Sequence, residues 1–341
     1  MELRNKLVVI FGGSGFVGRS VVRALAKSGA RIRVAMRRPH LGGDLRLAGD
    51  PGQIQLVQAN LRVASSVQRA MEHADIVVNL VGLLYEKGPQ NFRKIHIDGA
   101  QGIADAAKAH GIRHVVHVSA IGADETSRVA YARTKGEAEF IFRSTIPATI
   151  ILRPSVIFGE GDGFLTRFAR MAMSAPFLPS IGFGRTRFQP IHVEDVADAL
   201  VRALERPDAQ GRIFELGGGN IYRFDDILRL ILRVTDRRAL LVPIPFFGAK
   251  LLGLFLEIVT RPVPGLAPPL TAGQVDMLMR DNVVDMEAHQ AGTIGIFQDL
   301  GLEPRHSLEA SAPAMLWPYR TQGQFHEFSE KRSAVDREGA A

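Results

Sequence analysis

Three side chains near the middle of the chain could carry proton-transfer chemistry, namely Ser119, Tyr131 and Lys135. Tyr131 and Lys135 are four residues apart at the start of a predicted helix, so their side chains share one face of it. Ser119 ends a predicted buried strand, which places its hydroxyl at the carboxyl edge of a sheet. A lysine ammonium close to a phenol lowers the pKa of that phenol. Tyr131 could therefore donate or accept a proton during hydride transfer, while the serine hydroxyl orients a carbonyl.

The same three residues have a second interpretation, in which no reaction takes place. A lysine can hold the ribose of a nicotinamide cofactor, and Tyr131 and Lys135 would then only position that ribose. Ser119, Tyr131 and Lys135 are therefore both candidate catalytic residues and candidate cofactor-binding residues, and the sequence leaves the choice open.

A glycine-rich segment, Gly12-x-x-Gly15-x-x-Gly18, lies between the first apolar run and a predicted helix. The first glycine permits a tight turn, the second lets the backbone approach a pyrophosphate, and the third lets the helix pack closely on the strand. The helix N-terminus adds free N–H groups and a partial positive charge. The segment predicts a dinucleotide site that includes Gly12, Ser14, Gly15, Phe16 and Gly18.

Two arginines, Arg37 and Arg38, follow the second predicted strand, where a protein that binds NAD usually carries an acidic residue for the ribose 2′-hydroxyl. A guanidinium can hold a 2′-phosphate through two charge-assisted hydrogen bonds, each worth about 1.5–3 kcal/mol net. The pair therefore predicts NADPH as the cofactor. The alternative is a pair of solvated arginines with no ligand.

Other residues at the ends of predicted strands should line the same crevice, on its adenine and nicotinamide sides. Because the carboxyl ends of parallel strands meet at one edge of the sheet, these residues lie beside the glycine-rich turn in the predicted fold. The further residues that we expect to contact the cofactor are Asn60, Leu61, Val81, Gly82 and Pro154.

The elements that must position these residues alternate between strand and helix. Apolar runs and helical spacing alternate along the first part of the chain, which is typical of a doubly wound parallel sheet of the Rossmann type in an α/β protein. Strands are predicted at 7–11, 31–36, 54–57, 76–81, 114–119 and 148–152, and helices at 16–27, 65–72, 91–109 and 131–142.

The pattern divides the chain into two regions and a tail. Residues 1–155 are predicted to form the NADP-binding domain, and residues 156–320 a smaller, partly discontinuous C-terminal α/β region. Within that region, a strand and helix near 189–204 are expected to return to the first domain. The polar tail, 321–341, has no core pattern and is predicted to be disordered.

Composition excludes several classes of protein. The chain has 341 residues, of which 46% are hydrophobic and 23% charged, so it is neither fibrous nor fully disordered. It contains no cysteine, which excludes thiolate metal sites and a cysteine nucleophile. We predict no bound metal, no signal peptide and no membrane span. The formal charge of +7 favours anionic partners, but the arginines do not interleave with aromatic residues, so we predict no nucleic-acid binding.

An unusually apolar segment, 245–270, lies in the C-terminal region. Only Lys250 and Glu257 interrupt its first half, and several prolines prevent its second half from continuing as a helix. A helix this apolar is buried in the core, or it contacts a partner or a membrane interface. We expect a contact with a membrane or with a membrane subunit, with burial in the core as the alternative.

The glycine motif together with Ser119 and Tyr131-x-x-x-Lys135 resembles the extended, or atypical, short-chain dehydrogenase/reductase superfamily. A narrower resemblance, over residues 5–320, is to the NADPH-binding accessory subunits of respiratory complex I, of mitochondrial or alphaproteobacterial type. It is carried by the segments 118–124, 131–137, 153–159, 188–196, 297–301 and 316–320.

This resemblance implies a tightly held NADPH with a structural or assembly role, outside the main path of electrons. It also implies partners among the other subunits of complex I. The protein would be peripheral, on the cytoplasmic face of a bacterial inner membrane or the matrix face of the mitochondrial inner membrane. Two departures weaken the case for turnover. His96 stands where active relatives usually carry an asparagine of a proton relay, and Asn60 stands where an aspartate is usual.

Three hypotheses follow from the sequence. The first is a non-catalytic, NADPH-binding accessory subunit of the proton-pumping NADH:ubiquinone oxidoreductase. The second is a free NADPH-dependent reductase or epimerase that acts on a small molecule, such as a quinone or lipid intermediate, through Ser119, Tyr131 and Lys135. The third is a redox sensor or assembly factor that responds to the NADPH/NADP ratio without chemistry.

Overall fold

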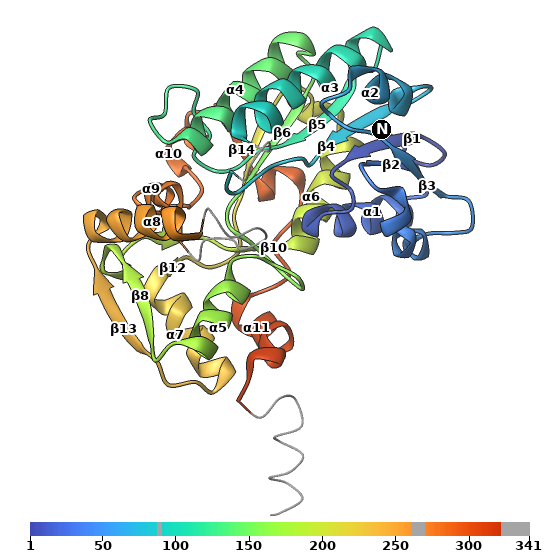
Figure 1. Cartoon of the computed structure of the whole chain (residues 1–341). Helices are drawn as coiled ribbons and strands as arrows, with labels where there is room; N and C mark the ends of the chain where they lie inside the picture. The colour runs from blue at the N-terminus through green and yellow to red at the C-terminus, as the bar shows by residue number, and fades with distance from the viewer. Residues whose placement is uncertain (87–90, 261–269, 322–341) are drawn as a thin grey trace, which may run out of the picture.

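A parallel sheet of eight strands lies at the centre of the protein in a computed structural model (Figure 1). The structure describes residues 1–86, 91–260 and 270–321. The predicted disordered tail lies outside these residues, apart from Thr321. In spatial order the strands are β14 (Gly295–Ile296), β11 (Ile213–Leu216), β6 (Ile150–Pro154), β5 (His114–Val118), β4 (Ile76–Asn79), β1 (Leu7–Phe11), β2 (Arg31–Met36) and β3 (Ile54–Gln58).

The strand order confirms the predicted doubly wound α/β fold. β1 lies between β2 and β4, so the winding of the chain reverses between β1 and β4. In open α/β sheets a ligand crevice forms at the carboxyl ends of the strands at such a reversal. Every residue of β1 is buried, as its continuous apolar run predicts for a strand covered on both faces. β6 begins two residues later than predicted, at Ile150 rather than at residue 148.

Helices cover both faces of the sheet (Figure 1). α1 (Phe16–Lys27) and α6 (Val193–Glu205) pack on one face and bury a shared apolar cluster. α2 (Ala64–Met71), α3 (Asp98–Ala109) and α4 (Ala130–Thr145) cover the other face. The helix predicted over 91–109 is interrupted, because residues Arg93–Ile97 form a π-helical turn before α3.

Segments from beyond residue 155 take part in the sheet and its helical layer. β11 pairs with β6, and β14 pairs with β11. α6 lies against α1 and contributes Val196 and Leu200 to the core beneath it. The boundary at residue 155 therefore does not separate two independent cores.

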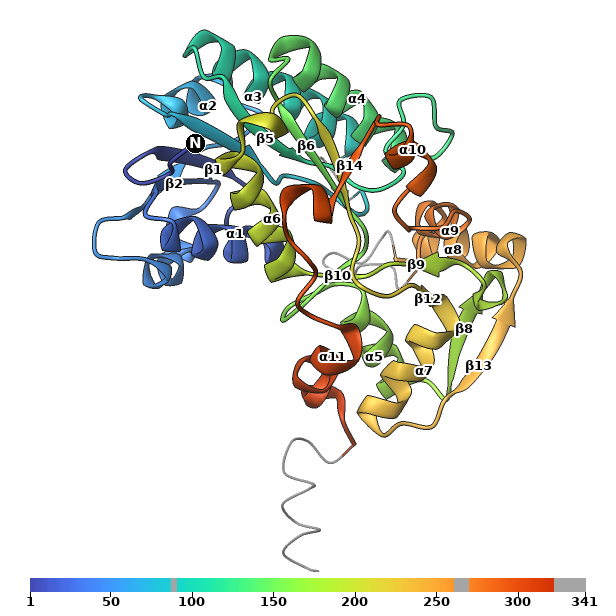
Figure 2. The ribbon, with the colours of Figure 1, turned by 180° about the vertical axis from the view of Figure 1, so that it is seen from behind.

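The remaining elements form a smaller lobe, seen from behind in Figure 2. Its core gathers Phe158, Phe168, Phe188 and Phe224. Its strands are β7 (Ile157–Phe158), β8 (Phe177–Ile181), β9 (Arg187–Phe188), β10 (Ile191–His192), β12 (Tyr222–Arg223) and β13 (Leu240–Ile244), and they form three two-stranded sheets. Its helices are α5 (Leu165–Ser174), α7 (Phe224–Thr235), α8 (Phe246–Thr260), α9 (Ala272–Leu278) and α11 (Leu308–Leu316). α10 (Met286–Gln290) lies beside the main sheet, where the Asp285 N–H before it donates to Glu215 of β11 at 2.9 Å (Figure 2). None of the helices within the described residues combines the length and apolar character that a membrane crossing requires.

A buried ion-pair network joins two strands of the sheet, β6 and β11, to the helix α4. Arg153 of β6 donates two hydrogen bonds to Glu139 of α4, at 3.0 and 2.7 Å, and lies 3.6 Å from Glu215 of β11. Both glutamate side chains are only 6% exposed. Removing the arginine would leave two carboxylates buried without a counter-ion, which costs more than the original pairs contribute.

We therefore expect Arg153→Met to lower the free energy of unfolding by about 3–5 kcal/mol at neutral pH, measured by urea denaturation. Burial already raises the pKa of Glu215. Without Arg153 the folded-state pKa of Glu215 rises further, so its protonation stabilises the variant and the loss is smaller at pH 5 than at pH 7.5. The control is Arg229→Met, which removes the ion pairs of Arg229 with Asp225 and Asp226. The Arg229 side chain is 58% exposed, so this variant should lose less than about 1 kcal/mol. Equal losses for both variants would contradict this account.

Candidate functional site

The turn between β1 and α1 has the geometry that the glycine motif predicts. Gly12 has a φ of +86°, and a Cβ on Gly18 would lie 2.3 Å from the Gly12 carbonyl oxygen. Only glycine therefore allows α1 to approach the turn this closely. α1 begins after Gly15 with no side-chain cap and no acidic residue in its first turn. Its first N–H groups and the positive end of its dipole remain available to an anion.

The two arginines predicted to select NADPH lie beyond the carboxyl end of β2. Both Arg37 and Arg38 are exposed. Within the described residues, neither side chain forms an ion pair with a carboxylate. Each guanidinium is therefore free to meet a phosphate on the β2 side of the crevice.

The residues predicted to line the crevice fall into two groups. Gly82 lies beside the catalytic candidates, because a Cβ there would be 3.8 Å from both the His96 Nε2 atom and the Lys135 Nζ atom. A Cβ on Gly12 would lie 3.2 Å from the Val81 nitrogen, so the turn after β1 and the segment after β4 are in contact. Pro154, at the end of β6, accepts a hydrogen bond from the Ile121 N–H at 3.1 Å.

Asn60 and Leu61 lie in the turn after β3, and their contacts hold that turn in place. The Asn60 side chain accepts a hydrogen bond from the Arg62 N–H at 3.1 Å, and its backbone N–H donates to the Ser66 hydroxyl at 3.0 Å. Leu61 packs against α3, where a Cβ on Gly99 would lie 3.1 Å from the Leu61 Cδ1 atom. These contacts fix the turn before α2, and Asn60 is half-buried in it.

Two of the three catalytic candidates, Ser119 and Lys135, lie at the end of β5, and Tyr131 lies in the first turn of α4 with its ring 5.8 Å from that of His96. Lys135 is buried, and its Nζ atom donates a hydrogen bond to the Val118 carbonyl oxygen at 2.8 Å. Ser119 follows Val118 directly, and its buried hydroxyl oxygen has no hydrogen-bond partner among the described residues. A buried hydroxyl without a partner is uncommon, and at the end of a central strand it indicates a position where a ligand supplies the missing hydrogen bond.

The electrostatics of the pair differ from the sequence-based expectation. Burial lowers the pKa of Lys135 to about 8, against an opposing effect of the Glu139 carboxylate. Burial raises the pKa of Tyr131 to about 12, and the lysine does not offset this. The expectation that Lys135 lowers the pKa of the phenol is therefore wrong for the protein without a ligand. The phenol is a poor proton donor at neutral pH in this arrangement.

His96 takes part in a hydrogen-bonded chain that the sequence did not reveal. The Leu83 N–H donates to His96 Nε2 at 2.9 Å, so the imidazole proton lies on Nδ1 and is directed to the Thr134 hydroxyl, also at 2.9 Å. Thr134 in turn donates to the Tyr131 carbonyl oxygen at 3.1 Å. Burial and the nearby Lys135 ammonium lower the pKa of His96 to about 3.

This chain connects the loop after β4 to the first turn of α4. His96 is placed on it by the π-helical turn, and its ring stacks on Phe92 at a centroid distance of 5.3 Å. The sequence marked His96 only as a departure from the usual asparagine. Its partners Leu83 and Thr134 carry no motif of their own, so only the folded structure could identify them.

The fold and the glycine-rich crevice define a nucleotide-binding protein of the Rossmann type. The chain belongs to the NAD dependent epimerase/dehydratase family, whose family model matches residues 8–217, and within it to the family of NADH dehydrogenase (ubiquinone) 1 alpha subcomplex subunit 9, mitochondrial. The mouse protein of that name is 32% identical over 318 residues, covering 92% of this chain and 81% of the mouse protein.

A second relative supports the family, and a solved structure supports the fold. The subunit of the same name from Dictyostelium discoideum is 33% identical over 67% of this chain, and the match spans only 64% of that protein, less than two thirds of its length. Among solved structures, the epimerase Mth375 from Methanothermobacter thermautotrophicus matches 98% of this chain with a TM-score of 0.68. At 18% identity that likeness supports the fold alone.

Burial of Lys135 should make the stability of the nucleotide-free protein depend on pH. Because the folded-state pKa of Lys135 is about 8, below its ordinary value of 10.5, the unfolded chain binds more protons between these two values. Stability from this group therefore rises with pH across that interval. Between pH 7.5 and pH 9.5 the unfolding free energy of wild type should therefore rise by about 2 kcal/mol relative to that of Lys135→Met.

The matched control is Lys27→Met, which removes an exposed lysine at the end of α1. Its difference from wild type should stay constant over the same interval, since the exposed ammonium keeps its solvent. Urea denaturation of all three proteins at both pH values gives the comparison. A constant difference for Lys135→Met would show that the lysine is not desolvated in the folded protein.

Proposed function

We propose that this chain is an accessory subunit of the proton-pumping NADH:ubiquinone oxidoreductase that binds NADPH and does not turn it over. The observation that carries the proposal is the match to subunits of that complex over 92% of the chain, combined with a complete dinucleotide turn. The bound nucleotide would stabilise the crevice and, through it, the subunit.

Three features of the chain fit a nicotinamide dinucleotide. The uncapped N-terminus of α1 would hold the pyrophosphate, and the unpartnered Ser119 hydroxyl and the Lys135 ammonium would meet the nicotinamide side. The match to an NAD dependent family supports the same class of ligand. When bound, such a dinucleotide supplies a hydride donor or acceptor.

The residues near the proposed nicotinamide position are poorly suited to proton transfer. Proton transfer would have to come from Tyr131, whose pKa of about 12 leaves it protonated and weakly acidic at neutral pH. His96 stays neutral, and both of its ring nitrogens are committed to hydrogen bonds, with Leu83 and Thr134. It therefore has no free nitrogen with which to relay a proton toward Lys135.

The second candidate function is a free NADPH-dependent reductase or epimerase. It is favoured by Ser119 and Lys135 at the end of β5, with Tyr131 one helical turn before Lys135 on α4. In that function the Lys135 ammonium would leave the Val118 carbonyl oxygen and move toward the ribose and the phenol.

Gentle solubilisation of membranes and the variant Tyr131→Phe distinguish the two functions. We expect the chain to migrate with the large respiratory complex on native gels, and membranes that carry Tyr131→Phe to respire with NADH at the wild-type rate. Phe keeps the ring packing against Phe92 and His96, so the fold is unchanged. If the isolated chain oxidises NADPH with a small substrate and Tyr131→Phe abolishes that activity, the accessory role is refuted.

Selectivity for NADPH is the finer part of the proposal and rests on Arg37 and Arg38. We expect Arg37→Asp to weaken NADPH binding by about 10-fold to 100-fold, because one charge-assisted contact is lost and a like charge faces the 2′-phosphate. NADH binding should fall far less, as measured by isothermal titration of both nucleotides. Arg46→Asp, on a neighbouring exposed arginine, is the matched control. Equal weakening of both nucleotides would place the 2′-phosphate elsewhere.

We further propose that α8 is the face that docks on the membrane arm of the complex. Both charged residues of α8 pair with α9: Lys250 donates to Asp276 at 2.7 Å, and Glu257 accepts the Ala272 N–H at 2.7 Å. The apolar side chains therefore remain on the outer face. The largest of them are Phe247, Leu251, Leu254, Phe255 and Ile258, and all are exposed.

This exposed apolar face supports a partner surface rather than a core helix. Phe247 is 75% and Phe255 is 62% exposed, and burying one such side chain contributes about 1.5–3 kcal/mol. Residues 261–269 of the predicted apolar segment lie outside the described residues. The proposed location is peripheral, on the cytoplasmic face of a bacterial inner membrane or the matrix face of the mitochondrial membrane.

The double variant Phe247→Glu with Phe255→Glu tests this surface. Both side chains are exposed, so the variant should have the melting temperature of wild type. It should, however, move from the membrane fraction to the soluble fraction. Leu47→Glu, an exposed apolar position far from α8 in the chain, should stay with the membranes. Binding of wild type to protein-free lipid vesicles separates a lipid contact from a subunit contact. Retention of the double variant on membranes would contradict the proposal.

A further inference from the structure

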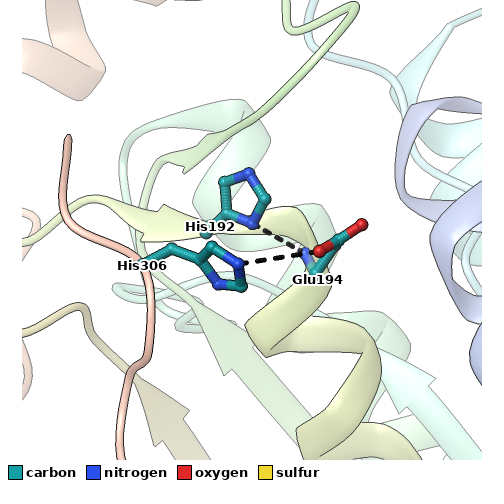
Figure 3. A group of neighbouring side chains, drawn as sticks. All are labelled: His192, Glu194 and His306. Carbon is teal, nitrogen blue, oxygen red and sulfur yellow. Dashed lines mark hydrogen bonds and ion pairs between the residues drawn. The ribbon is translucent and has the colours of Figure 1, made fainter. Parts of the chain in front are cut away.

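A second cluster of ligand-type side chains lies where the smaller lobe meets α6. His192 ends β10, Glu194 stands in the first turn of α6, and His306 comes from the segment that precedes α11 (Figure 3). One ligand atom of each residue lies within 4.8 Å of the others. The nucleotide proposal uses none of these residues.

A buried carboxylate orients one of the two imidazoles. Asp195 is 1% exposed, and its carboxylate lies 2.9 Å from His306 Nδ1. It also accepts the backbone N–H groups of Arg305 and His306, at 3.4 and 3.3 Å. Because an ionised carboxylate only accepts hydrogen bonds, the proton of the His306 ring lies on Nδ1. The lone pair of Nε2 then points away from Asp195. A carboxylate in this position is typical of histidines that ligate metals.

The His306 Nε2 atom faces a second acceptor. It lies 3.6 Å from Glu194 Oε2, which is too far for a hydrogen bond. The other oxygen of Glu194 is taken by Arg23, at 3.3 Å, so Oε2 is the one left for another partner. A cation placed between these two atoms would be bound by the imidazole nitrogen and by the carboxylate oxygen. In a tetrahedral zinc site, nitrogen and oxygen ligands are separated by about 3.3 Å, close to the observed spacing.

His192 can supply the third ligand. Its ring stacks on His306 with a centroid distance of 4.2 Å. Its Nδ1 atom accepts only a long hydrogen bond, 3.3 Å from the Glu194 N–H. His192 is half-buried beside that ring, and one of its nitrogens lies within 4.8 Å of the ligand atoms of Glu194 and His306.

We propose that His192, Glu194 and His306 form a binding site for a divalent transition cation of the zinc class, with Asp195 as the positioning residue for His306. Two imidazoles and one carboxylate, with a water molecule in the fourth position, are a ligand set that zinc accepts. The bound cation would connect the start of α6 to the segment before α11, which are more than a hundred positions apart in the chain. The site therefore revises the sequence-based prediction of no bound metal.

Titration of the full-length, chelator-treated protein with Co²⁺ tests the site, because tetrahedral Co²⁺ has visible absorption and Zn²⁺ displaces it. We expect one saturable equivalent for wild type, and none for His192→Gln or His306→Gln. Asp195→Asn, which keeps the shape but loses the negative charge, should weaken binding by about 10-fold to 100-fold. His40→Gln removes an exposed histidine outside the cluster and should bind as wild type does.

A further variant and a second measurement distinguish loss of the site from misfolding of a variant. Glu194 is 48% exposed at its side chain, so Glu194→Gln should fold normally and still lose most of the affinity. Zn²⁺ should raise the melting temperature of wild type and of His40→Gln but not that of the ligand variants, since only the folded site binds. If wild type shows no saturable binding, or binds no better than Glu194→Gln and His306→Gln, the site does not exist.

Discussion

The crevice depends on the close approach of two backbones at the turn after β1. The Gly12 carbonyl oxygen and the Gly18 Cα are so near that no side chain fits between them. This contact sets the direction of α1, and α1 in turn brings its uncapped N-terminus to the place where the sheet reverses its winding. The segment after β4 then lies against the same turn through Val81. A shift of this helix would displace the phosphate end of the crevice and the α6 layer together.

The sheet and its turn could be predicted from the sequence because their signals are local. A continuous apolar run such as β1, a glycine motif, or a lysine four residues after a tyrosine lies within one or two elements. The π-helical turn before α3 could not be predicted, because helical spacing does not distinguish it from an ordinary helix. The pKa of Tyr131 was predicted in the wrong direction, since burial is decided by neighbours distant in the chain.

Long-range contacts explain the other omissions. The bonds that His96 makes to Leu83 and Thr134 join three separate elements, and no spacing rule connects them. The apolar character of α8 was visible in the sequence, but which face it turns outward depends on its contacts with α9. In the same way, His306 meets His192 only because the chain returns to α6 after completing the smaller lobe.

The elements that carry the catalytic candidates are joined to a strand from beyond the first region of the chain. Arg153 joins β6 to α4, which carries Lys135, and to β11, which is formed after the chain has left the first region. Ser119 and Pro154 belong to the neighbouring strand ends β5 and β6.

The entry of β11 and β14 into the main sheet has a consequence for how the protein is made. β14 consists of residues 295 and 296, so the edge of the sheet is completed only after residue 296 has left the ribosome. Until α6 has been synthesised, Val21 and Leu25 of α1 lack part of their apolar cover. The nucleotide-binding half is thus a late product of translation rather than an early one, and a growing chain must keep that surface from other hydrophobic segments in the meantime.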